Sequence, residues 1–459
     1  MGVSAALVGQ VFTVAASVLT SIFVARMFGP SGTGTYALVG NLFAAVVLLA
    51  ALGLPTGITF LVSRRVWSAR AAFRQSVGTA VPMGLIGAAL GLGVYALTDH
   101  SIFDGVDLVE ALTIMGAVPL GLVWVFCGSV ALAGDHYERF ASFLISRAAL
   151  TVAAVVGLGI PFGLTGAIVG FAIAQMLGAG VAVASLLRLT RRERGHATIR
   201  PGGDRPSSPL RSAFRFGRWA WSADVLQFLN YRLDLFMLAA FATRADVGSY
   251  SVAVSLTMLA WLAPAAIGQV LLPRTASLDS AAEAGEVGRE QADRATARVI
   301  RHTVILQLPT GVAVVVLLLV GLPVVYGHPF HQSIGLGLLL LPGVLILSIA
   351  KVISPIITGR GFPQYSVYNG LISVPVTLAL YLVLIPRLGA TGAALASSAS
   401  YMLTTVVAMY FYRRATGGSV RAAVIPTLAD LREYPRAASQ LVSSSRRWLA
   451  TLRHRTTQG

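Results

Sequence analysis

The sequence predicts an all-α integral membrane protein, and three observations support this class. Of the 459 residues, 56% are hydrophobic and only 12% are charged. The mean hydropathy is +0.76, which is unusual for a soluble domain. The apolar residues gather in runs of about 20 residues, the length at which a helix crosses the hydrocarbon of a bilayer. The chain is therefore expected to cross the membrane many times.

Twelve membrane-spanning helices are predicted, in two lobes of six. They are expected over 3–25, 35–60, 75–97, 108–132, 141–161, 165–188, 217–242, 248–272, 302–326, 333–357, 364–385 and 389–412. The segments between these spans are too short for a soluble catalytic domain, and no catalytic residue is predicted. The expected organisation is an N-terminal lobe over 1–190, a cytoplasmic linker over 191–213, a C-terminal lobe over 214–413 and a basic tail over 414–459.

The basic residues fix the predicted orientation. With a cytoplasmic N-terminus, 29 of the 35 basic residues fall in loops and the tail on the inner side of the membrane. Only Arg26, Arg244 and Arg387 fall on the outer side. Because basic residues are retained on the cytoplasmic side, both termini are expected in the cytoplasm. This placement also explains the net charge of +17 without a nucleic-acid partner.

Two short motifs recur at equivalent places in the two halves. Gly34-Thr35-Tyr36 opens the second span, and Gly248-Ser249-Tyr250 opens the eighth. Thr165-Gly166-Ala167 opens the sixth span, and Thr391-Gly392-Ala393 opens the twelfth. Six spans is an even number, so both halves share one orientation. The pattern predicts an internal duplication with a central cleft between parallel lobes.

The seventh predicted span carries three charges, Asp224, Arg232 and Asp234. Each costs about 2.5–3.5 kcal/mol at a helix centre on insertion scales, so these side chains must face protein or water. At about 100° per residue, one arc of roughly 120° holds five polar residues, with Arg232 about 80° beyond Asp224. Those five are Asp224, Gln227, Asn230, Tyr231 and Asp234. Two interpretations remain open: a structural ion pair between helices, or the lining of a transport cavity.

Three segments resemble the polysaccharide transporter branch of the multidrug/oligosaccharidyl-lipid/polysaccharide flippase superfamily. They read VARMFGPSGTGTYALVGNLFAAVVLLAALGL, FGRWAWSADVLQFLNYRLDLFMLAAFATRADVGSYSVAVSL and GRGFPQYSVYNGLISVPVTLALYLVLIPRLGATGAALASSAS. The resemblance extends from Gly9 to Arg414. It implies a two-lobe, twelve-helix flippase of the bacterial inner membrane. Such a protein moves polyprenyl-diphosphate-linked oligosaccharides to the outer leaflet for cell-surface polysaccharide biosynthesis. Glycan polymerases or glycosyltransferases are the expected partners.

Three other functions stay open at this point. Relatives of the same fold flip the peptidoglycan precursor, but that branch usually has two more helices, which this chain lacks. Other relatives export drugs against Na⁺ or H⁺ and commonly use an acidic residue in the first helix, whereas no acidic residue precedes Asp99 here. A membrane glycan enzyme needs a sizeable external loop, and the longest here lies near 98–107. No cofactor or metal is expected, and coupling to Na⁺ or H⁺ is left open.

A diphosphate headgroup needs cationic partners, and the arginine fork suits phosphate oxygens best. Arg232 is the predicted central ligand, with Arg26 at the outer mouth, Arg64 and Arg65 at the inner mouth, and Arg147 and Lys351 in the wall. Asp224 and Asp234 are expected to tune these arginines or to titrate. The predicted sugar contacts are Asn41, Gln175, Gln227, Asn230, Tyr231 and Asn369. The alternative is that these residues anchor the topology or bridge helices.

Overall fold

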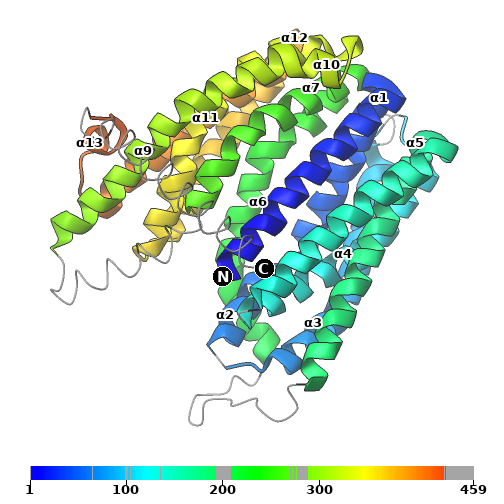
Figure 1. Ribbon diagram of the computed structural model, residues 1–459, viewed down its shortest axis with the longest axis horizontal. Coiled ribbons are helices and arrows are strands. Elements are labelled where there is room, and N and C mark those ends of the chain that lie inside the picture. The colour runs from blue at the N-terminus through cyan, green and yellow to red at the C-terminus, as the bar shows by residue number, and fades with distance from the viewer. Residues whose placement is uncertain are drawn as a thin grey trace, which may run out of the picture. The chain divides into compact units, whose positions relative to one another are not determined.

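The computed structural model describes residues 2–64, 66–98, 102–103, 105–134, 136–192, 208–268, 271, 275, 288–427 and 430. Within these ranges the regular structure is entirely helical, which confirms the predicted all-α class (Figure 1). The α-helices are α1 (Gly2–Ala51), α2 (Leu54–Ser63), α3 (Ala69–Thr98), α4 (Leu108–Ala133), α5 (Tyr137–Arg192), α6 (Pro209–Phe241), α7 (Arg244–Thr257), α9 (Arg289–Val316), α10 (Leu322–Val325), α11 (Gln332–Gly359), α12 (Gln364–Thr416) and α13 (Val420–Val424). Short 3-10 or π segments are η1 (Met258–Trp261), η2 (Leu317–Gly321) and η3 (His328–Phe330).

Eight of the described helices are long and apolar enough to cross a membrane. Three of them, α1, α5 and α12, contain a glycine with non-helical dihedral angles: Gly29 (φ 64°), Gly163 (φ 66°) and Gly389 (φ 57°). A positive φ is strained for residues with a Cβ, so glycine permits each break. Gly29 and Gly163 lie in gaps between predicted spans, and Gly389 lies at the start of one. The number of twelve spans stays a prediction.

Helices α5 and α12 fold back on themselves at these glycines. A Cβ added to Gly166 would lie 2.2 Å from the carbonyl oxygen of Leu158, and one on Gly392 would lie 2.2 Å from that of Leu384. Residues eight positions apart in a straight helix are separated by about 12 Å, so each helix is an antiparallel pair, as the two halves of α5 show in Figure 1. The two contacts are the same contact repeated 226 residues later, as the predicted duplication requires.

The second predicted repeat motif brings α1 against α7. A Cβ on Gly34 would lie 2.1 Å from the carbonyl oxygen of Arg244, and one on Gly248 would lie 1.8 Å from that of Pro30. Neither position has room for a side chain. Gly34 and Gly248 are also equivalent positions of the two repeats. Each repeat therefore contacts the other through the same glycine.

Helix α2 is separated from α1 by Leu52 (φ 47°) and Gly53 (φ 73°), which correct the prediction of one uninterrupted span over 35–60. The run from Ala50 to Pro55 contains no polar side chain that would have indicated this break. The break lets α2 contact α6, where a Cβ on Gly217 would lie 1.9 Å from the carbonyl oxygen of Gly53. A Cβ on Gly57 would lie 2.1 Å from that of Ala213.

The chain forms two compact units. The first consists of residues 1–259, 314–344 and 363–404, and the second of 260–313, 345–362 and 405–459. A large apolar core in the first unit contains residues of α1, α2, α3, α4 and α5. A second core there contains residues of α6, α7 and α12. Residues 193–207 of the predicted linker lie outside the described residues.

In the second unit, one arginine fixes the segment after α12. Arg301 donates from Nε to Asp430 Oδ2 (2.7 Å), from Nη2 to Oδ1 (3.2 Å) and from Nη1 to the carbonyl of Ala422 (2.8 Å). Asp430 also accepts from the backbone amide and hydroxyl of Thr427. These contacts, above all the hydrogen bonds from Arg301, hold the pKa of Asp430 well below its usual range. The predicted tail is described only as far as this point.

Candidate functional site

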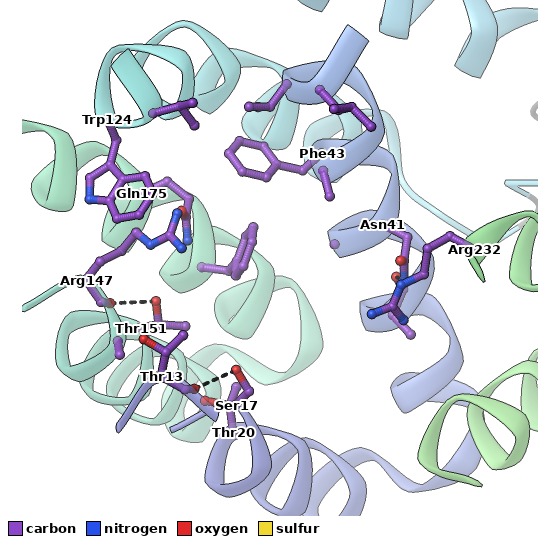
Figure 2. Close-up of a pocket in the computed structure, with 18 of the residues that line it drawn as sticks. Thr13, Ser17, Thr20, Asn41, Phe43, Trp124, Arg147, Thr151, Gln175 and Arg232 are labelled. Atoms are coloured by element: carbon purple, nitrogen blue, oxygen red, sulfur yellow. Dashed lines mark hydrogen bonds between the residues drawn. The ribbon is translucent and has the colours of Figure 1, made fainter. Parts of the chain in front are cut away.

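A cavity of ≈ 750 Å³ opens within the first unit. Its lining comes from both halves of α1 and from α2, α4, α5, α6 and α7. Apolar side chains such as Phe43, Val47 and Leu48 form part of the wall, and many hydroxyl, amide and charged side chains lie between them. Figure 2 shows several of these polar residues, among them Thr13, Asn41 and Arg147. A concave site that combines apolar walls with polar groups is typical of ligand-binding cavities.

The first half of α1 presents four hydroxyl residues to this cavity: Thr13, Ser17, Thr20 and Ser21. Three of them donate to the carbonyl four residues earlier: Thr13 to Gly9 (2.9 Å), Ser17 to Thr13 (2.9 Å) and Thr20 to Ala16 (2.8 Å). Their protons are therefore used within the helix, and their oxygen lone pairs remain as acceptors. Sequence reasoning missed this stripe, although its spacing of i, i+4, i+7 and i+8 was a readable signal.

Arg147, on the first half of α5, is one of two arginines in the lining. Its Cζ lies 3.6 Å from the centre of the Trp124 ring of α4, a cation–π arrangement. Figure 2 shows its guanidinium beside the amide of Gln175 from the second half of α5. Two predicted residues thus lie together, with Trp124 as a partner that was not predicted.

Arg232 of α6 is the second arginine, and it lies across the cavity from Arg147, beside Asn41 (Figure 2). Within the described residues, its guanidinium makes no hydrogen bond or salt bridge. Asn41 donates to the carbonyl of Ala37 (2.7 Å), which leaves its amide oxygen for other donors. Asp224 also lines the cavity and is exposed to it. The cavity therefore brings together the predicted central ligand Arg232, the predicted wall residue Arg147, two predicted sugar contacts and one predicted tuning acid.

The rest of the polar stripe on α6 turns away from the cavity. Asp234 is 0% exposed and accepts hydrogen bonds from the hydroxyl of Tyr250 (2.6 Å), from Ser397 (3.3 Å) and from the amide of Leu235 (2.7 Å). Asp234 does not line the cavity.

A second group of contacts continues from the buried Asn230. Asn230 donates to Thr404 (2.9 Å) and accepts from Ser400 (2.8 Å), while Asn369 donates to the carbonyl of Thr404 (3.2 Å). Ser400 also bonds Thr377. These residues and those around Asp234 form what we call the buried network. Asn230 and Asn369 were predicted to contact sugar, and the structure places both in this network instead.

The remaining predicted residues lie elsewhere. Arg26 donates to the carbonyls of Val325 (2.7 Å) and Val324, at the end of α10. Arg64 stacks on Phe60, 4.4 Å from the ring centre. Neither arginine lines the cavity.

Lys351 belongs to the second unit and lies 4.3 Å from the centre of the Trp261 ring. Gln227 donates to the hydroxyl of Tyr231 (3.5 Å), and Tyr231 packs edge-on against Tyr401. None of these residues is in the cavity lining. Arg65 lies outside the described residues. In the described ranges, no group of three or more His, Cys, Asp or Glu is placed to hold a metal ion.

Comparison with known proteins identifies the family. Residues 1–279, more than half of the chain, match the family model described as polysaccharide biosynthesis protein. The chain belongs to the polysaccharide biosynthesis protein family. One relative is the probable low-salt glycan biosynthesis flippase Agl15 of Haloferax volcanii, 21% identical over 201 residues. That alignment covers 44% of this chain and 42% of the relative, so it spans less than half of that protein.

Solved structures confirm the predicted flippase-superfamily fold for this family member. An inward-facing multidrug resistance MATE transporter of the MOP superfamily matches with a TM-score of 0.65 and 18% identity, over 90% of this chain and 98% of that one. The lipid II flippase MurJ, in an inward closed conformation, matches with a TM-score of 0.57 and 12% identity, over 88% and 86%. At these identities the likeness shows the fold.

Proposed function

We propose that this protein flips a polyprenyl-diphosphate-linked oligosaccharide from the inner to the outer leaflet by alternating access. The observation that carries the proposal is the cavity with Arg232, whose guanidinium makes no hydrogen bond or salt bridge within the described residues. Asp234 attracts it only electrostatically, so its N–H groups stay available to an anionic ligand, and its fork matches phosphate oxygens in pairs. The family and the glycan flippase among its relatives support a glycan substrate.

The diphosphate is assigned to Arg232 rather than to Arg26 or Arg64. Arg26 already donates to two backbone carbonyls, and Arg64 lies over Phe60 outside the cavity. The hydroxyl oxygens on α1 and the amide of Asn41 supply acceptors that suit sugar hydroxyl groups. We infer that both termini face the cytoplasm, as the distribution of basic residues predicts.

The membrane potential is the proposed driving force. Moving one charge through the potential is worth about 2.3 kcal/mol per 100 mV, and a dianionic headgroup that leaves a negative interior gains up to roughly twice that. Flipping in vesicles at the same rate with and without an imposed potential would remove this part of the proposal.

A multidrug exporter is the second candidate because the same fold serves that function in a solved relative. Two arginines and one carboxylate in the lining disfavour a cationic drug. A lipid II flippase shares the diphosphate chemistry, so it differs from the proposal in the group that the diphosphate carries.

The test is a flipping assay in proteoliposomes with a polyprenyl-diphosphate oligosaccharide. Wild type is compared with Arg232→Ala, Arg232→Lys and the control Arg64→Ala, which removes an arginine outside the cavity. We expect Arg232→Ala to lose at least about tenfold in rate, the effect of one charge-assisted hydrogen bond. Arg232→Lys shows whether charge alone suffices, and Arg64→Ala is expected to flip normally. Normal flipping by Arg232→Ala would assign that arginine to structure, and a wild type that flips no such lipid would favour the exporter.

A further inference from the structure

Arg147 is the second cationic side chain in the cavity lining, and it is surrounded by its own set of residues. We call this set the Arg147 subsite; it consists of Trp124, Arg147, Thr151, Gln175 and Gly178. The stem of Arg147 runs along Gly178, where a Cβ would lie 3.0 Å from Cγ and 3.2 Å from Cβ of the arginine. The absence of a side chain at Gly178 gives this stem its room. The Trp124 ring then covers one face of the guanidinium at 3.6 Å. A guanidinium held flat in this way keeps its N–H edges available for an acceptor in its own plane.

The neighbouring amide also lacks a protein partner. Gln175 is 4% exposed and lines the cavity, yet its side chain makes no hydrogen bond to any residue in the described part of the chain. A buried amide without a hydrogen bond is costly. Thr151, one turn after Arg147, donates to the carbonyl of Arg147 (2.8 Å) and presents its oxygen to the same space (Figure 2). The subsite therefore offers donors and acceptors that no described side chain occupies and that a ligand in the cavity can use.

The equivalent positions in the second repeat show the contrast. Arg147 and Thr151 correspond to Ser373 and Thr377, 226 residues later. Ser373 donates to Asn369 (3.1 Å), and Thr377 bonds Ser400. In the second repeat these hydroxyls bond other side chains of α12, whereas in the first repeat Arg147 and Thr151 line the cavity.

The position of the subsite determines which part of a substrate it meets. Arg147 and Arg232 lie on opposite sides of the cavity (Figure 2). Asp234 attracts Arg232 electrostatically, but no carboxylate forms a salt bridge with Arg147 in the described chain. A diphosphate bound at Arg232 leaves Arg147 facing the other part of the same molecule, its sugar.

We propose that the Arg147 subsite binds the carboxylate of an acidic sugar, so that the transported oligosaccharide contains a hexuronate. The guanidinium fork takes the two carboxylate oxygens, and the amide of Gln175 donates to one of them or to a neighbouring hydroxyl. This role of Arg147 rests on the proposed flippase function and names its substrate class.

The experiment uses two synthetic polyprenyl-diphosphate disaccharides that differ only in one residue, glucuronate or glucose. Proteoliposomes carry wild type, Arg147→Gln, Arg232→Ala or Arg64→Gln. Arg64→Gln is the matched control because it also removes an arginine from an aromatic ring, but outside the cavity. We expect wild type to flip the glucuronate lipid faster, and Arg147→Gln to lose roughly 10- to 100-fold on that lipid alone. Arg232→Ala is expected to slow both lipids, and Arg64→Gln neither.

The outcomes separate the two proposals. If Arg147→Gln slows both lipids equally, Arg147 is a diphosphate ligand and the acidic-sugar assignment fails. If it slows neither, or if wild type prefers the glucose lipid, the assignment also fails. Normal flipping of the glucose lipid by Arg147→Gln shows that the variant is folded. Failure of wild type on both lipids overturns the flippase function itself.

Discussion

The two sequence repeats place equivalent side chains in opposite surroundings. Four pairs of equivalent positions show this: Thr20 and Asp234, Tyr36 and Tyr250, Arg147 and Ser373, and Thr151 and Thr377. The first member of each pair lines the cavity. The second member of each pair is held in the buried network by hydrogen bonds to side chains of α6, α7 or α12.

At these positions the polar side chains of the first repeat face the cavity, and those of the second repeat form hydrogen bonds inside the protein. Satisfied polar groups in a low-dielectric interior rigidify a structure, and unsatisfied ones are retained where a ligand uses them. At these four pairs the first repeat therefore supplies cavity groups and the second repeat supplies the buried network, while Arg232 and Asp224 bring α6 of the second repeat to the cavity as well. Substitutions at matched positions separate these two roles.

The largest effect is expected for Asp234→Ala compared with Thr20→Ala. Removing the carboxylate deletes the acceptor that Tyr250, Ser397 and the amide of Leu235 share and leaves a cavity in the buried network, which is expected to lower the free energy of unfolding by about 3 kcal/mol. In the described chain Thr20 bonds only within its own helix, so its loss is expected to cost less than about 1 kcal/mol. Thermal unfolding in detergent measures both. Equal losses would show that the two repeats do not differ in this way.

The next effect concerns the contact between the repeats. Gly248→Ala places a methyl group 1.8 Å from the carbonyl oxygen of Pro30, so α1 and α7 must separate. Overpacking of this kind costs about 2 kcal/mol. The control is Gly40→Ala, a cavity position with nothing within 4 Å of the added Cβ. Unfolding midpoints, together with thiol labelling of a cysteine placed at Ser249, report stability and opening. An unchanged Gly248→Ala protein would mean that this contact is not tight.

A smaller effect distinguishes the two equivalent tyrosines. Tyr250→Phe removes the donor to Asp234 and is expected to lower the free energy of unfolding by about 1.5 kcal/mol. Tyr36→Phe removes a hydroxyl that has no hydrogen bond in the described chain, so stability should change little. If Tyr36→Phe slows flipping while stability holds, the hydroxyl of Tyr36 serves the substrate, as its place in the cavity lining predicts. Equal destabilisation by both variants would contradict the comparison.

The smallest effect is expected for Asp430, a carboxylate outside the candidate membrane spans and outside both sets of paired positions. The pKa of Asp430 is depressed below its ordinary value near 3.9, chiefly by hydrogen bonds from Arg301. A carboxylate with a depressed pKa stabilises the folded segment while it is charged. This stabilisation is present above the unfolded-state pKa, at about pH 4, and is lost as the pH falls through the folded-state pKa. Hydrogen exchange over residues 419–427, corrected for intrinsic rates, should therefore be flat from pH 7 to 5 and rise only in stronger acid. Asp430→Asn should show the faster exchange from pH 7 to 5, and the difference should shrink in stronger acid. A change near pH 6 in wild type would rule out this carboxylate.

The fold was largely readable from the sequence because its signals are local. Apolar run length predicted the spans, and the short motifs at Gly34 and Gly248 predicted the duplication. The break before α2 was missed because Leu52 and Gly53 lie within an apolar run, and apolar composition alone does not predict backbone dihedral angles. Only the contact of α2 with α6 explains that break.

The site was predicted less well, since a helical wheel gives direction but not the neighbour that lies there. Asp224 and Asp234 share one arc of α6, yet the first lines the cavity and the second lies in the buried network. Arg232, outside that arc, reaches the cavity. The position of Arg147 beside Trp124 depends on Gly178, 31 residues later, so no local pattern reveals it.

The contact of Gly34 with Gly248 has a historical consequence. If the two halves descend from one gene, these glycines are a single ancestral residue present twice. A residue that touches its own copy lies on a twofold axis, as in an isologous dimer interface. The six-helix ancestor was then a parallel homodimer in which this glycine met itself, before fusion made the two copies one chain. Only after fusion were the copies free to diverge, so that Tyr36 could line a cavity while its counterpart Tyr250 joined the buried network.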